Sequence, residues 1–285
     1  MNPLFEAALQ VAAILVLIPF SVAIGAVVES WLAHTPTPSM LAPYRRLANM
    51  FTENRQSRGS WIANVLLAAS VALTLVAVAS IPVFVDVSRR SSNILVIIGL
   101  IIIADVALAI SAFDEDERSA KRRTWSLPRI AGASVPLLVA TCTLVATSGS
   151  AEAAYLAGSA TPRDILALAA PVGVFLLAAC TRLVPFSAPF TGRSLALAQL
   201  ARLATSFALA ALAVRMLFAL PFIDSANALY GIAPFAIVFA LLLGALGALF
   251  HAAIAKMRLS VDDVTIISLV LAIVGFVIMI FRILV

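Results

Sequence analysis

Long apolar runs separated by short polar stretches dominate the pattern of this chain of 285 residues. Runs of about 18 or more apolar residues are long enough to cross a bilayer as helices. A transmembrane β-barrel would alternate apolar and polar positions over about 10 residues, which these runs do not do. The pattern therefore predicts an all-α, polytopic membrane protein with a single transmembrane domain over residues 1–285. We expect about eight spans, at residues 5–29, 61–85, 93–113, 130–148, 163–185, 193–221, 231–256 and 262–285.

The first polar loop breaks this pattern. After the stretch HTPTPSMLAP, the sequence PYRRLANMFTEN interleaves arginines, an asparagine and a glutamate with apolar residues at helical spacing. This spacing predicts an amphipathic cytoplasmic helix within residues 40–55 that lies in the membrane interface. Leu47, Met50 and Phe51 would face lipid or the helix bundle. Arg45 and Arg46 would then meet lipid headgroups or a docked partner.

Composition agrees with a membrane protein. The chain is 63% hydrophobic and 12% charged, whereas soluble domains average about 25% charged residues. The net charge of +5 is typical of a membrane protein that keeps its Lys and Arg residues in cytoplasmic loops, and we expect no nucleic-acid partner. Cys142 and Cys180 lie in apolar runs without the spacing of metal ligands, so no metal site is expected.

The distribution of Lys and Arg predicts the orientation. The loops after the first, third, fifth and seventh predicted spans hold 13 of these residues and the opposite loops hold 3. Positively charged loops remain in the cytoplasm. We therefore expect a multi-pass protein of a bacterial-type inner (plasma) membrane, with both termini on the outer side.

Three motifs carry a resemblance to a known family. The first is the loop TPTPSMLAPYRRLANMFTEN, the second is RTWSLPRIAGA, and the third is PFSAPFTGRS. Together with eight spans and outward termini, they resemble the family of membrane proteins that dock the peripheral arm of respiratory complex I. The first motif is closer to the counterpart of that protein in formate hydrogenlyase-type and other energy-converting [NiFe] hydrogenase complexes. The matching positions are Tyr44, Leu47, Met50, Phe51, Glu53, Trp125, Ser126, Leu127, Pro185 and Phe186.

The resemblance implies partners and a role. The partners would be membrane lipids, antiporter-like membrane subunits and peripheral cytoplasmic redox or other catalytic subunits. Those partner subunits would carry any iron–sulfur clusters or [NiFe] centre, with no cofactor in this chain. The family's acidic loop is missing here, so quinone or proton chemistry would be reduced or lost. The residues expected to face a docked partner are Arg45, Arg46, Arg122, Arg123 and Trp125.

Two ionisable residues lie deep within predicted spans. Asp105 is 8 residues from Phe113, which is about 12 Å at 1.5 Å per residue, and Arg202 is about as deep in the sixth span. A charge inside a membrane segment is costly without a partner, so we expect Asp105 and Arg202 to pair across the bundle. Three interpretations remain open at this stage: a structural ion pair, part of a proton or ion path, or no pairing.

Two further titratable residues lie near predicted span ends. Glu29, beside Trp31, is either an interfacial anchor or a carboxylate of a proton path or partner link. His251 is either a hydrogen-bonded histidine or a titrating proton shuttle. If protons move through this chain, Asp105 and Glu29 are the candidates.

The sequence contains no pattern that predicts independent catalysis. No nucleophile–base arrangement, phosphate-binding loop or Cys/His cluster is evident. A non-catalytic subunit of an oxidoreductase-type complex is therefore favoured over an enzyme. The alternative is a stand-alone small membrane transporter, although the spans show no inverted repeat and few polar groups at mid-span.

Overall fold

The structure is a computed structural model that describes residues 3–53, 60–81, 93–119, 127–151, 165–183, 190–217, 243–253, 256–257 and 261–284. Helices are the regular secondary structure of these residues. They are α1 (Pro3–Leu32), α2 (Ala42–Thr52), α3 (Trp61–Ser80), α4 (Ile94–Ser119), α5 (Leu127–Ser148), α7 (Ile165–Leu183), α8 (Gly192–Leu217) and α10 (Val261–Leu284). A further apolar helix covers Leu243–Ala253.

Five helices in the described residues are long and apolar enough to cross a membrane. They cover Ala8–Leu32, Trp61–Ser80, Ile94–Ala112, Gly192–Ala213 and Asp263–Phe281. The other three predicted spans coincide with shorter apolar helices at Ser134–Ser148, Ala169–Arg182 and Leu243–Ala253. The all-helical, multi-pass membrane class predicted from the apolar runs is therefore confirmed, and a count of eight full spans stays a prediction.

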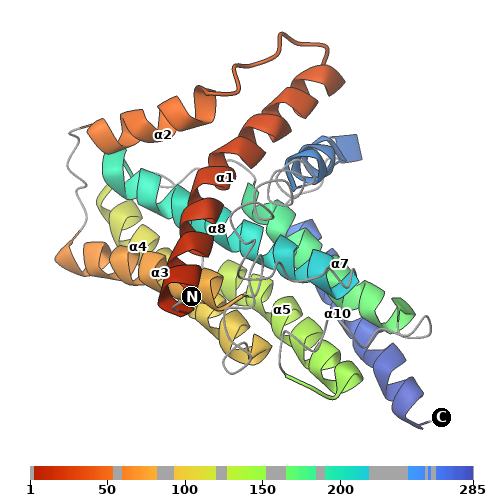
Figure 1. Ribbon diagram of the computed structural model, residues 1–285. Helices are drawn as coiled ribbons and strands as arrows, with labels where there is room; N and C mark the ends of the chain where they lie inside the picture. The colour runs from red at the N-terminus through yellow and green to blue at the C-terminus, as the bar shows by residue number, and fades with distance from the viewer. Residues whose placement is uncertain are drawn as a thin grey trace.

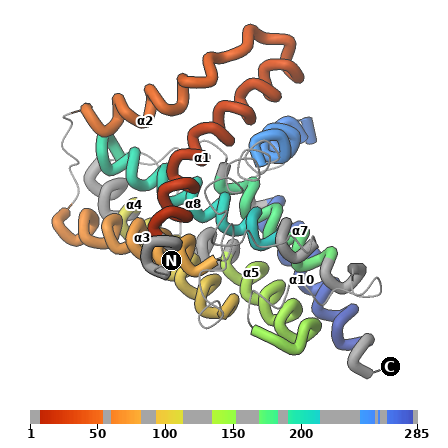
Figure 2. Tube along the Cα trace, viewed as in Figure 1, coloured from red at the N-terminus to blue at the C-terminus, as the bar shows by residue number. Residues whose placement is uncertain are grey.

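Most of the helices pack as antiparallel neighbours in one bundle. Helix α3 lies on α4, α7 lies on α8, and α10 packs against both α5 and α7. Helix α1 crosses this bundle obliquely, and α2 folds back beside α1 and the start of α8 (Figures 1 and 2). The largest fully buried side chains include Phe175 of α7 and Phe207 of α8. The core therefore has its centre where α7 and α8 meet.

Hydroxyl groups join α3 to α4 inside the bundle. Ser70 donates to the carbonyl of Ala104 at 2.8 Å, and Ser111 donates to the carbonyl of Ala63 at 2.7 Å. The two bonds lie one heptad apart on each helix, so they fix the antiparallel register. Small hydroxyl residues let membrane helices approach closely and bond across the contact.

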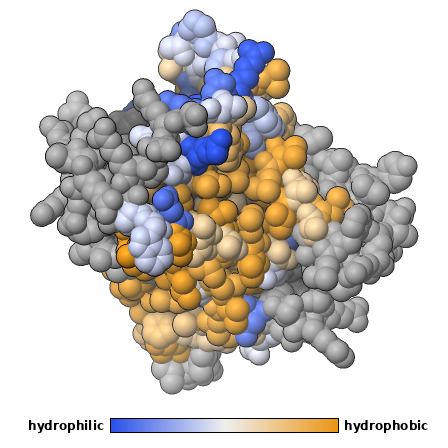
Figure 3. Space-filling model, turned by 90° about the vertical axis from the view of Figure 1, so that its left-hand side faces the viewer, coloured by the Kyte–Doolittle hydropathy of each residue, from blue (hydrophilic) through white to orange (hydrophobic). Residues whose placement is uncertain are grey.

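Apolar side chains cover much of the outer surface, which is expected where lipid is the solvent. Figure 3 shows one face with a broad apolar belt and hydrophilic residues above it. On α10, large apolar side chains are exposed along nearly the whole helix, from Ile266 to Phe281. The hydrophobic effect in water therefore cannot hold this bundle together alone. Close packing and internal polar contacts must contribute.

Candidate functional site: a docked amphipathic helix and a buried ion pair

Helix α2 is fastened to α1 by the hydroxyl of Tyr44. This hydroxyl donates to the carbonyl of Val16 at 2.8 Å. Burial raises the pKa of Tyr44 above its ordinary value, and a hydrogen bond with the backbone of Phe20 opposes that rise. Tyr44 therefore stays protonated and able to donate.

The other end of α2 is fastened to α8. Arg193, at the start of α8, donates from Nε to the carbonyl of Phe51 at 3.0 Å. A cation at a helix C-terminus also interacts favourably with the helix dipole. Along the same helix Leu47 and Met50 are half-buried, while Phe51 is 37% exposed. The apolar side of α2 therefore rests on the bundle.

The opposite side of α2 is polar and open. Arg45, Arg46 and Asn49 are exposed, as the sequence pattern predicts for a surface that meets headgroups or a partner. The other expected docking residues, Arg122, Arg123 and Trp125, lie outside the described residues. Their role stays a prediction, and so does the membrane-surface position of α2.

A buried ion pair joins α4 to α7. The carboxylate of Asp105 accepts from Nη2 of Arg182, while Nη1 of Arg182 donates to the carbonyl of Ala178 at 2.9 Å. The side chains of Arg182 and Asp105 are only 10% and 20% exposed. The guanidinium group is held at two points, because one terminal nitrogen bonds to its own helix and the other to the carboxylate.

The structure corrects the expected partner of Asp105. The direct ion pair is with Arg182, whereas Arg202 of α8 donates to the carbonyl of Thr181 at 3.3 Å. Arg202 still belongs to the same group, since the charges of Asp105 and Arg182 both act on it. Arg182 lies near the cytoplasmic end of the predicted span 163–185, where its charge is counted with the adjoining loop. In the structure the last turn of α7, which ends at Leu183, places Arg182 against Asp105.

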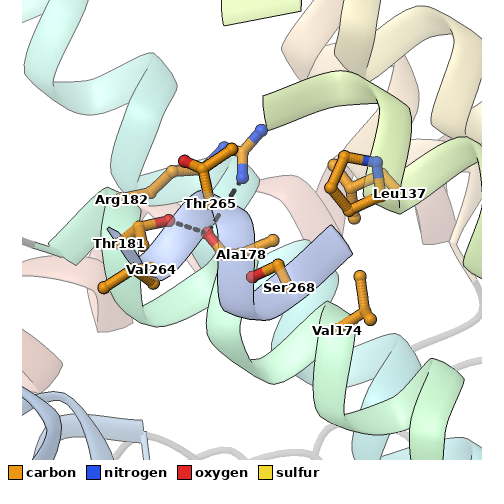
Figure 4. A pocket seen from close by; sticks show the side chains of 9 residues that line it. Leu137, Val174, Ala178, Thr181, Arg182, Val264, Thr265 and Ser268 are labelled. Atoms are coloured by element: carbon orange, nitrogen blue, oxygen red, sulfur yellow. Dashed lines mark hydrogen bonds between the residues drawn. The ribbon is translucent and has the colours of Figure 1, made fainter. Parts of the chain in front are cut away.

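A small cleft with a partly polar lining lies beside Arg182, where α5, α7 and α10 meet. Figure 4 shows the hydroxyls of Thr181, Thr265 and Ser268 around the same space as the Arg182 guanidinium group. Pro136 and Leu137 of α5 line another side. Nothing in the apolar runs of the sequence predicts this cleft, because its polar residues are single Ser and Thr positions on separate helices.

A second pair of titratable side chains joins two other helices. Nδ1 of His251 is 2.5 Å from Oε1 of Glu29, and both side chains are about two-fifths exposed, at 41% and 44%. The bond joins the end of α1 to the helix Leu243–Ala253. Glu29 and His251, which sequence reasoning treats separately, are therefore partners.

The same two helices also touch through a glycine. A Cβ atom added at Gly244 would lie 2.5 Å from the carbonyl oxygen of Ser21 and 2.8 Å from Cβ of Ile24. Only glycine allows this approach. The helix pair is therefore joined at two points, Gly244 and His251.

The described residues contain no group of three or more His, Cys, Asp or Glu residues that could hold a metal ion. The chemistry that the arrangement does support is electrostatic and structural. It consists of one buried ion pair, one half-exposed pair and one exposed basic surface on a firmly held helix.

These features define a multi-helix integral membrane protein with a surface helix folded back on its first span. Among solved structures, the chain is similar to a chain in the structure of the membrane-bound sulfane sulfur reductase (MBS), an archaeal respiratory membrane complex. The identity is 14%, the match covers 98% of this chain and 100% of that chain, and the TM-score is 0.70. The chain thus shares the fold of a subunit of a respiratory membrane complex. No protein-family model matches this chain, and no curated protein sequence matches it.

Proposed function

We propose that this chain is a non-catalytic membrane-arm subunit of a complex I-like or energy-converting hydrogenase-like assembly. It anchors a peripheral catalytic module on the cytoplasmic side and joins that module to antiporter-like membrane subunits. Two independent lines support this proposal. The fold is shared end to end with a subunit of a respiratory membrane complex, and the first-loop motif resembles the loop of the complex I membrane protein that docks the peripheral arm.

The attachment of α2 is the single observation that carries the proposal. Tertiary hydrogen bonds fasten both ends of α2, through Tyr44 and Arg193, while Arg45 and Arg46 stay exposed. A helix that only lay in the membrane interface would need no hydrogen bonds to other helices. A rigid basic surface is suited to a soluble partner with an acidic face, because charge complementarity sets orientation and binding rate.

The buried ion pair supports a structural role for the interior. Asp105 is held by Arg182, whose other terminal nitrogen is bonded to the α7 backbone. A carboxylate that carries protons must change its charge, which is costly beside a fixed guanidinium. We therefore propose that Asp105, Arg202 and Glu29 stabilise the helix arrangement. Quinone or proton chemistry, iron–sulfur clusters and any [NiFe] centre belong to partner subunits.

Purification in a mild detergent tests the docking role. The affinity-tagged chain is recovered from its native membrane, and its co-purifying peripheral subunits are identified and quantified. Arg45→Glu with Arg46→Glu should lower their recovery about tenfold, the effect of about 1.4 kcal/mol of lost attraction. Lys256→Glu is the matched control, since Lys256 is exposed on another helix. Recovery of a lone oligomer from wild type would overturn the proposal and favour a stand-alone transporter.

A further inference from the structure

The cleft between α5, α7 and α10 combines polar groups with space. Nine residues line it, and four are polar: Thr181, Arg182, Thr265 and Ser268. Arg182 alone among these nine is charged, and its partner Asp105 lies on α4, outside the lining. The guanidinium group therefore contacts a carboxylate on one side and borders the cleft on another (Figure 4).

The size of the cleft decides what it holds. Its volume is about 30 Å³, whereas one buried water needs roughly 10–15 Å³ and two to four polar partners. An apolar cavity of this size would stay empty, but this one offers hydroxyl groups from α7 and α10 and the N–H groups of a guanidinium. There is room for about two water molecules and for no larger ligand.

The hydrogen bonds already present leave acceptors and donors for water. The hydroxyl of Thr181 donates to the carbonyl of Ala178 at 2.9 Å, so its oxygen lone pairs remain able to accept. Nη1 of Arg182 donates to the same carbonyl, and a guanidinium group has five N–H donors in all. The bonds that Figure 4 draws are thus compatible with further bonds toward the cleft.

We propose that this cleft is a hydrated vestibule, a binding site for water that solvates Arg182 from the side not occupied by Asp105. The physical reason is the desolvation penalty of the ion pair. Two charges inside an apolar bundle lose their hydration, and their mutual attraction seldom compensates fully for the lost hydration free energy. Charged groups in membrane segments accordingly face one another or a water-filled cavity. The vestibule supplies that water within the first turns of α10, which begins at Val261.

Cysteine accessibility tests the vestibule. Cys142 and Cys180 are first replaced by alanine, and Ser268→Cys is then introduced as the reporter. The probe is hydrogen peroxide, which is close to water in size and oxidises a cysteine thiolate that water reaches. Ser206→Cys is the control, since Ser206 is also buried, at 0% exposure against 8% for Ser268, bonds to the carbonyl of Ala179 and does not line the cleft.

The cysteine at position 268 should be oxidised at least about tenfold faster than the one at 206, because oxidation of a thiol follows its exposure to solvent and its thiolate character. A second reporter, Thr265→Cys, should lose this reactivity when Ser268→Leu fills the cleft. Unchanged elution in size-exclusion chromatography establishes that each variant is folded. Equal rates at 268 and 206, or a rate at 265 that Ser268→Leu does not lower, would overturn the proposal.

Discussion

Two charge pairs join distant parts of this chain, and they differ in almost every physical respect. Asp105 and Arg182 are separated by 77 residues and are mostly buried, at 20% and 10% exposure. Glu29 and His251 are separated by 222 residues and are about two-fifths exposed. The first pair lies within the bundle, between α4 and α7. The second joins the end of α1 to the helix Leu243–Ala253, at the side of the bundle.

The difference shows where an ion pair controls assembly and where it only adds to other contacts. A guanidinium group is always charged, so the loss of either Asp105 or Arg182 leaves an uncompensated charge away from water. An imidazole is charged only when protonated, and a half-exposed pair is weakened by salt and solvent. The bundle should therefore depend strongly on the first pair and weakly on the second.

Breaking the buried pair should give the largest effect. Arg182→Gln removes the cation and leaves the Asp105 carboxylate in the bundle. We expect it to destabilise the protein by about 3–5 kcal/mol, the usual cost of removing one partner of a buried pair. Thermal unfolding of the purified protein in detergent, followed by circular dichroism, measures the loss. The double variant with Asp105→Asn should recover part of it, because no charge is then left alone.

A double-mutant cycle distinguishes Arg182 from the partner that sequence reasoning predicts. The coupling energy between Asp105 and Arg182 should exceed that between Asp105 and Arg202, since Arg202 acts on the carboxylate without forming the direct pair. Equal coupling energies in the two cycles would show that Asp105 interacts equally strongly with both arginines. The direct pair with Arg182 would then not be the dominant contact.

The glycine contact should dominate the second region. Gly244→Ala places a Cβ atom 2.5 Å from the carbonyl oxygen of Ser21, and such overpacking costs about 1–3 kcal/mol. Gly99→Ala in α4 is the control, because nothing lies within 4 Å of its added Cβ. The control should be neutral or stabilising, since alanine favours a helix by up to about 1 kcal/mol over glycine. The same unfolding measurement compares the two variants. Equal changes in stability for the two variants would show that α1 does not stay in close contact with the helix that carries Gly244.

The class of fold is readable from the sequence, because its signal is long and repeated. Each apolar run contains many residues that all indicate a membrane-spanning helix, so one atypical residue does not change the prediction. The amphipathic pattern of PYRRLANMFTEN is similarly redundant, and a helix is present at Ala42–Thr52. What these patterns report is local: whether a stretch forms a helix and which solvent each side prefers.

The contacts that build the site depend instead on single residues and on packing. Arg182 lies near the end of the predicted span 163–185, and no local pattern shows that it pairs with Asp105 of α4. Glu29 and His251 are 222 residues apart, and no spacing rule relates them. Tyr44 matches a position of the family motif, but nothing in the sequence shows that its hydroxyl bonds to the carbonyl of Val16 in α1.

Glu29→Gln should have the smallest effect and so completes the comparison. It removes the charge of the carboxylate and keeps an amide of the same shape that can still bond to His251. Exposed pairs usually contribute about 0.2–1 kcal/mol, so the unfolding midpoint should fall slightly at low salt and hardly at all at high salt. Measuring the variant and wild type at two salt concentrations isolates the electrostatic part. A loss as large as that of Arg182→Gln, unchanged by salt, would mean that the bond between Glu29 and His251 is shielded from solvent. The half-exposed pair would then hold α1 as firmly as Asp105 holds α7.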